Sequence, residues 1–162
     1  MSSLNLASDS SKFKVLSALG EPSVAKGVAH SVDSFIDVTL TAAQIDALNA
    51  TAVEMIPAPG AGKALVFRGA WAFLDYNSAA YAGSSQTITF KYENSSGATV
   101  GTITEAFTES TADAYQWVEP VTAVALANKA IVAVASADFT SGNSPIYLRL
   151  FYKTITVDLS AE

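Results

Sequence analysis

The sequence predicts an all-β fold, an antiparallel β-sandwich or jelly-roll-like domain, on three observations. Half of the 162 residues are apolar and only 15% are charged, a composition typical of a packed domain rather than a disordered chain. From residue 32 onward, short β-rich runs follow one another, separated about every ten residues by turn signals rich in Gly, Pro, Asn and Ser. The length suits a single domain of this class.

The first 31 residues differ from the rest and are predicted to form an extended N-terminal arm, which leaves residues 32–162 as the β-sandwich domain. The arm begins Ser-rich, and its one brief apolar run ends at Gly20-Glu21-Pro22. We expect it to lie on a partner and to become ordered on binding. Its candidate capsid-binding contacts, on the interpretation given below, are Leu4, Leu6, Phe13, Val15 and Leu16.

The sandwich domain is expected to open with a strand at 35–40, in which apolar and polar residues alternate. One short connecting helix follows, at about 41–49. Thr41 and Gln44 have the spacing of a capping box, in which each side chain satisfies a backbone amide of the first turn. A further strand is predicted at 52–56.

The longest apolar run, at 63–76, predicts a central strand covered on both faces, because both of its alternating sets of side chains are apolar. The small Ala and Gly residues of this strand (Ala64, Gly69, Ala70 and Ala72) are expected to lie against another subunit. Trp and Tyr are enriched in such interfaces. The predicted subunit interface comprises Leu65, Phe67, Trp71, Phe73 and, from a later strand, Trp117.

The remaining runs complete the sandwich. Segments 86–93 and 99–105 flank Asn-Ser-Ser-Gly-Ala and predict a hairpin. The final strand, 146–159, changes its apolar phase near Tyr152, which predicts a β-bulge there. Other β-rich runs lie at 115–118, 121–126 and 129–137.

Little in the sequence favours catalysis, and we predict no enzyme, no catalytic residue, no cofactor and no metal site. His30 is the only histidine, and no Gly-x-Ser-x-Gly motif supports a catalytic triad with it. The carboxylates are spread singly, and cysteine is absent. The segment 60–63 lacks two defining residues of a phosphate-binding loop and precedes a strand, so it is interpreted as a turn.

The charge and hydropathy patterns bear on partners. A formal net charge of −6 with scattered basic residues argues against nucleic acid, whose binding depends on clustered Lys and Arg. No apolar run approaches the ~18 residues needed to cross a bilayer, so no membrane span is expected.

Four segments resemble small virion proteins of tailed bacteriophages: 40–51, 56–63, 74–83 and 144–152. The similarity spans roughly residues 36–158, hence the domain but not the arm. It implies a head decoration (cement) protein, a virion structural protein made in the host cytoplasm. Such a protein would sit as a homotrimer on the outer surface of the capsid and stabilise contacts between copies of its partner, the major capsid protein.

An alternative stays open at this stage. Exposed rings also stack on sugars, so a second hypothesis is a carbohydrate- or receptor-binding β-sandwich module of a tail or fibre. The rings considered as sugar platforms are Tyr76, Tyr81, Tyr115 and Trp117.

Overall fold

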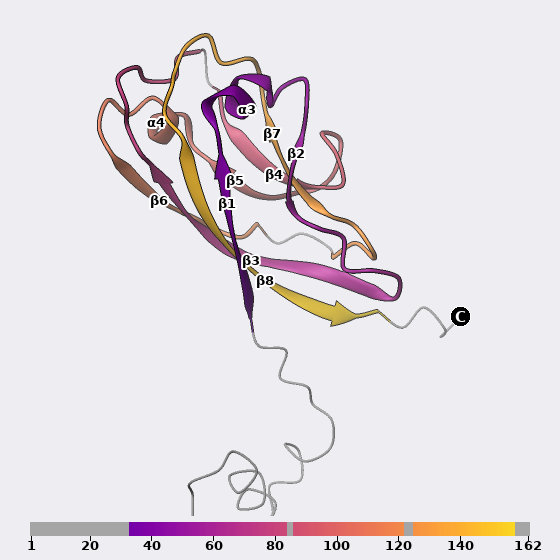
Figure 1. Cartoon of the computed structure of the whole chain (residues 1–162). Helices are drawn as coiled ribbons and strands as arrows, with labels where there is room; N and C mark the ends of the chain where they lie inside the picture. Colours follow the sequence, from indigo (N-terminus) through magenta and orange to yellow (C-terminus); the bar gives the residue numbers. More distant parts are fainter. Residues whose placement is uncertain (1–32, 84–85, 122–124, 158–162) are drawn as a thin grey trace, which may run out of the picture. The chain divides into compact units, whose positions relative to one another are not determined.

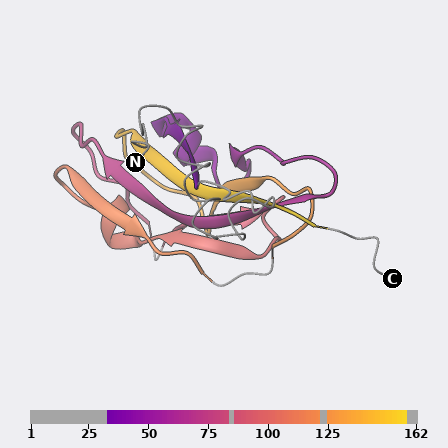
Figure 2. The same ribbon diagram turned by 90° about the horizontal axis from the view of Figure 1, so that it is seen from below.

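The computed structural model describes residues 33–83, 86–121 and 125–157, and shows two stacked antiparallel sheets, which confirms the predicted fold class (Figure 1; turned by 90° in Figure 2). The predicted arm, with its candidate contacts and His30, lies outside the described residues. The front sheet has the order β1-β8-β3-β6 and the back sheet β2-β7-β4-β5. The front strands are β1 Ser34–Leu40, β8 Ile146–Thr156, β3 Lys63–Leu74 and β6 Ala114–Val118; the back strands are β2 Val53–Ile56, β7 Ile131–Ala135, β4 Ile88–Tyr92 and β5 Thr99–Ile103.

Within the described residues, two short helices connect strands. The predicted one, α3 (Ala42–Ala47), has the expected capping box: the Gln44 amide donates to the Thr41 hydroxyl oxygen at 3.3 Å, and the Thr41 amide donates to the Gln44 side-chain oxygen at 3.0 Å. The sequence did not predict α4 (Glu105–Thr108), which follows β5. Neither of these helices is long enough to cross a membrane.

Apolar side chains from both sheets fill the space between them. Phe67 of β3 packs edge-on against Phe90 of β4, with ring centroids 5.8 Å apart. The buried Tyr92 hydroxyl donates to the Leu65 carbonyl oxygen at 2.7 Å, so this polar atom is satisfied inside the core. Gly101 of β5 leaves room for Phe67, because a Cβ there would come within 2.9 Å of that ring. The core therefore depends on close packing across the two sheets.

A β-bulge in β3 decides which side chains of that strand face outward. Phe67 pairs with Tyr152 of β8, but Gly69 pairs with Phe151, so Arg68 is an extra residue in β3. A single inserted residue reverses the alternation. Leu65 and Phe67 consequently point into the core, whereas Trp71 points to the outside. Regular alternation predicted these residues on one face, and the phase change near Tyr152 predicted a bulge in β8. The bulge lies opposite, in β3.

Two other expectations need correction. β3 is central in its sheet, as predicted, but its outward face is open to solvent at Trp71 rather than covered. The predicted strand at 121–126 lies partly outside the described residues, and its described ends at Val121, Ala125 and Leu126 are not in a strand.

The bulge predicts an unusual sensitivity at Gly69. This residue has a φ of +122°, and a Cβ would lie 2.3 Å from the Trp117 ring. Gly69→Ala should lower the free energy of unfolding by about 1 kcal/mol more than Gly60→Ala, because Trp117 must also move. Gly60 is the matched control, since its φ is +95° and nothing lies within 4 Å of its added Cβ. Urea unfolding measures both, and equal losses would show that Trp117 does not pack on Gly69.

The aromatic face, a candidate functional site

The outer face of the front sheet gathers aromatic side chains from all four of its strands, whose arrangement Figure 1 shows as a ribbon. Strand register aligns them in rows. One row runs Thr39, Tyr147, Phe73, Tyr115; the next runs Asp37, Arg149, Trp71, Trp117; Phe35 and Phe151 form a third. We call the seven rings the aromatic face: Phe35, Trp71, Phe73, Tyr115, Trp117, Tyr147 and Phe151.

These rings pack against one another across the strands. Phe73 lies between Tyr115 and Tyr147, with ring centroids 4.6 and 6.2 Å away and planes tilted by only 22° in both cases. Trp71 meets Trp117 edge-on at 5.2 Å. Phe151 links Trp117 to Phe35, at 6.1 and 6.4 Å. The rings therefore form two mutually supported groups on one face, one of three rings and one of four, with the separations at which aromatic pairs attract.

Much of this surface is open to solvent. The exposed fraction is 73% for Tyr115, 57% for Phe35, 52% for Trp71 and 44% for Tyr147. The outer face of the back sheet differs, because it carries Thr89, Lys91 and Thr102 beside two almost buried valines. Among the described strands, the outer face of the back sheet therefore has no cluster of exposed rings comparable to the aromatic face.

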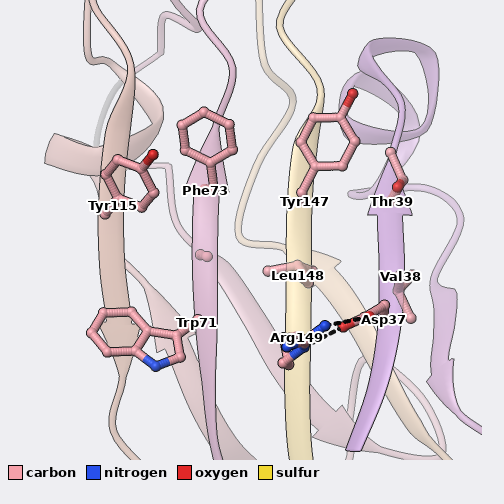
Figure 3. A pocket seen from close by; sticks show the side chains of 10 residues that line it. Asp37, Val38, Thr39, Trp71, Phe73, Tyr115, Tyr147, Leu148 and Arg149 are labelled. Atoms are coloured by element: carbon pink, nitrogen blue, oxygen red, sulfur yellow. Dashed lines mark hydrogen bonds and ion pairs between the residues drawn. The ribbon is translucent and has the colours of Figure 1, made fainter.

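A groove runs over the upper part of the aromatic face (Figure 3). Its volume is about 580 Å³. Figure 3 shows Tyr115, Phe73 and Tyr147 side by side at one end; at the other end the Trp71 ring lies on the side of β6 and the Arg149–Asp37 pair on the side of β1. A second hollow of about 420 Å³ continues past Trp71, with Trp117, Phe151 and Pro120 in its walls. Trp71 lines both hollows, so the two are adjacent on the same face.

Two charged side chains at the centre of this face, Arg149 and Asp37, neutralise each other. Arg149 donates to both carboxylate oxygens of Asp37, at 2.7 and 2.8 Å, and its guanidinium lies 4.7 Å from the centre of the Phe35 ring. The hydrogen bond from Arg149 lowers the pKa of Asp37, and the same bond raises the pKa of Arg149. The pair therefore persists at neutral pH and is lost only as the pH falls through the lowered pKa of Asp37. Arg68 and Asp33 make a looser pair at 3.8 Å.

The structure divides the five residues predicted as a subunit interface. Trp71, Phe73 and Trp117 lie together on the aromatic face. Leu65 and Phe67 are only 1% and 6% exposed, so they belong to the core and offer no surface to another subunit; the bulge explains the error. The interface role of the other three stays a prediction.

Sequence reasoning missed several members of the aromatic face. Phe35, Tyr147 and Phe151 were not proposed as site residues, although the alternation in their strands carried a signal. In β1, Phe35 points to the same side as Asp37 and Thr39. In β8, Tyr147 and Phe151 point to the same side as Arg149. A strand whose outward phase contains rings instead of only polar residues indicates an uncommon outer face.

The four rings considered as platforms for sugar stacking do not all lie at one site. Tyr115 and Trp117 both lie on the aromatic face. Tyr81 does not, because it is 1% exposed and its hydroxyl donates to the Ser144 carbonyl oxygen at 2.6 Å. Burial raises the pKa of Tyr81 above its usual range. Tyr76 is half-buried in the loop after β3, where its amide donates to Asp113 at 3.0 Å.

Comparison with known proteins gives no family assignment. No family model matches the sequence, and no curated protein matches it. Among solved structures, the chain is similar to one in the "acidic stable capsid structure" of Helicobacter pylori bacteriophage KHP30, with a TM-score of 0.47 and 16% identity over 80% of this chain and 96% of that one.

Two further solved structures are similar at lower scores. A chain of the Cyanophage Pam1 capsid asymmetric unit has a TM-score of 0.43 and 14% identity, covering 75% of this chain and 83% of that one. A chain from Bacillus endospore appendages, described as disulfide-linked pili, has a TM-score of 0.36 and 15% identity, covering 78% and 88%. At these values none of the likenesses establishes a common family.

Proposed function

We propose that this protein is a non-enzymatic bacteriophage head decoration protein, which binds the outside of the capsid as a homotrimer and stabilises contacts between major capsid proteins. The observation that carries the proposal is the aromatic face, whose rings are too exposed and too contiguous for a domain that acts alone. The resemblance of residues 36–158 to small virion proteins of tailed phages favours a capsid as the setting.

The chemistry of the face suits protein binding. Trp, Tyr and Arg are the residues that contribute most to protein–protein affinity, and Trp71, Tyr115 and Arg149 supply all three types. Its groups are rings and a mutually satisfied ion pair, which bind and orient a partner rather than move protons. On a shell, many identical contacts act together, so each contact can be weak while the assembly is strong.

In this proposal the N-terminal arm holds the protein to the shell. Deleting residues 1–19 should abolish binding to undecorated heads while leaving thermal unfolding of the domain unchanged, because the core described here is built from residues after 33. Co-sedimentation with heads measures the first effect and circular dichroism the second. A full-length control with Leu4, Leu6 and Phe13 changed to serine should lose binding in the same way. Full occupancy by the truncated chain would contradict the role of the arm.

The groove favours one second candidate, a carbohydrate-binding virion module. Its volume of about 580 Å³ falls within the range of small-molecule sites. It also combines ring faces with the hydroxyls of Tyr115 and Tyr147 and the polar pair of Asp37 and Arg149. A glycan array separates the two functions: a sugar bound by the intact chain and lost in Trp71→Ala or Trp117→Ala would favour this candidate. If the chain binds heads but no glycan on the array, the decoration function is favoured.

A further inference from the structure

We infer that the free edge of β1 binds an extended segment of another protein, in which apolar residues alternate with Lys or Arg. The bound segment adds a further strand to the front sheet. This contact goes beyond the proposed function, because it uses the hydrogen-bonding edge of the sheet rather than the aromatic face. Three features of the molecule support it: the state of the sheet edges, the exposure of the inner face of β1, and the charge along that strand.

Three of the four sheet edges are poorly suited to further pairing in the described part of the chain. β2 has only four residues and is interrupted by a bulge. β5 is covered by two contacts. The Val121 amide donates to the Val100 carbonyl oxygen at 2.8 Å, and the Gln116 side chain donates to the Thr102 carbonyl oxygen at 3.2 Å. β6 has five residues, and Pro120 follows shortly after its end. Short strands, bulges, proline and covering contacts all hinder the addition of another strand.

β1 is the edge without such protection. Its seven residues pair with β8 in one unbroken register, and the strand contains no Pro or Gly. Among the described residues, no backbone hydrogen bond outside this ladder reaches Ser34–Leu40. Every second residue of an edge strand turns its N–H and C=O away from the sheet. β1 therefore offers a regular row of donors and acceptors to an extended backbone.

The inner face of β1 is apolar and incompletely covered. Ile36 and Val38 point between the sheets but are only half-buried, whereas their partners in β8, Leu150 and Leu148, are 0% and 2% exposed. Inward side chains of an added strand would lie beside Ile36 and Val38 and remove their apolar surface from water. This favours a segment with apolar residues at alternate positions.

The charge of β1 bears on the remaining positions of the segment. The strand carries Asp37 and no basic residue, and Asp33 precedes it. Arg149 reaches Asp37 from β8, yet the Asp37 side chain is 56% exposed. A carboxylate has about four acceptor sites, so the two hydrogen bonds from Arg149 leave capacity for a donor at the edge. Together with the net charge of −6, this favours Lys or Arg on the outward side of the segment.

The test adds a synthetic peptide, Lys-Val-Lys-Ile-Lys-Val-Lys, to the unaltered chain without heads. Titration calorimetry measures the dissociation constant, and hydrogen exchange followed by nuclear magnetic resonance locates the contact. We expect alternate amides of β1 to exchange more slowly when the peptide is bound, while the amides of β2, β5 and β6 keep their rates. Binding that leaves exchange in β1 unchanged would overturn the assignment to this edge.

Two N-methylated peptides test whether the backbone is recognised. One carries methyl groups on the amides of its apolar residues, the other on the amides of as many lysines. These two sets of amides point to opposite edges of a strand, and only one edge can pair with β1. One peptide should therefore lose at least about tenfold in affinity, and the other should bind as the parent does. Equal affinities of the two would contradict strand addition.

Two variants of the chain test the inner face. Ile36→Thr keeps a β-branched residue but removes apolar surface, so it should raise the dissociation constant of the peptide about tenfold. Thr39→Ser, on the outer face of the same strand, is the matched control and should change it less than about twofold. Similar effects of both variants would show that Ile36 does not contact the peptide.

A peptide with every lysine replaced by glutamate tests the charge. It should show no measurable binding, because its carboxylates would face Asp37. If it binds as well as the lysine peptide, the preference for a basic segment is wrong.

The outcomes also distinguish other occupants and the proposed function. If alternate amides of β1 are already protected without peptide, the chain itself fills this edge and the inference is overturned; protection that rises with protein concentration would identify a second copy. A chain that binds the peptide but not heads overturns decoration and leaves the edge contact standing. A chain that binds heads but no peptide does the reverse.

Discussion

Replacing Phe90 with alanine is expected to lower the free energy of unfolding by about 3–5 kcal/mol, a large part of the stability of a domain this size. Phe90 is fully buried at the centre of the back sheet and packs against Phe67 across the sandwich. Its removal leaves a cavity that the two sheets cannot close. The strands that carry Phe90 and Phe67 are each hydrogen-bonded to a neighbouring strand on both sides, so neither can move into the space. Urea unfolding followed by far-ultraviolet circular dichroism measures the loss.

Phe35→Ala provides the matched control, since it removes the same ring from the outside of the front sheet. Phe35 is 57% exposed, so the unfolding free energy of a single copy should fall by about 1 kcal/mol or less. The two variants together test whether the rings form two sets, one that stabilises the fold and one that binds. A loss at Phe35 as large as that at Phe90, in dilute monomer, would show that the outer rings belong to the folding core.

The sequence predicted the elements of this fold better than the direction of its side chains. Alternation and turn residues located β1, β3, β4, β5 and β8, and the Thr41–Gln44 spacing located α3 with its cap. These signals are local, so they depend on a few neighbouring residues only. The short helix α4 lacked such a signal, because the hydroxyl of its N-cap residue Thr104 does not cap the helix and donates to Gln116 of β6 instead.

The candidate site was harder to predict because it depends on one bulged residue. Period-two reasoning places Phe67 and Trp71 on the same face of a regular strand, and the structure separates them through Arg68. A clue was present at Gly69, since an isolated glycine within a strand often marks a bulge. The rest of the face is assembled by register across four strands, which no local pattern encodes.

The second large effect is expected from reversing a charge on the aromatic face. In the unaltered chain, Asp37 and Arg149 form a bidentate ion pair. Asp37→Arg replaces the carboxylate with a second guanidinium beside Arg149. A neutral ion pair is thereby replaced by two unpaired positive charges, which repel each other and the matching charges of another copy. Because burying such groups costs several kcal/mol, we expect association to weaken by at least about 100-fold in sedimentation experiments. The domain itself should stay folded, because Asp37 is exposed.

Exchanging the two charges tests why the pair is there. In the double variant Asp37→Arg, Arg149→Asp, the salt bridge can form again with its direction reversed, across the same register position of β1 and β8. If the pair serves to keep the face neutral while its rings bind, association should recover to within about tenfold of the unaltered chain. If instead a partner reads the position of each charge, the double variant should bind as poorly as Asp37→Arg alone. Recovery of the trimer together with recovery of head binding would place the function of this face in contact between copies, while recovery of the trimer without head binding would mean that the capsid itself contacts Asp37 or Arg149.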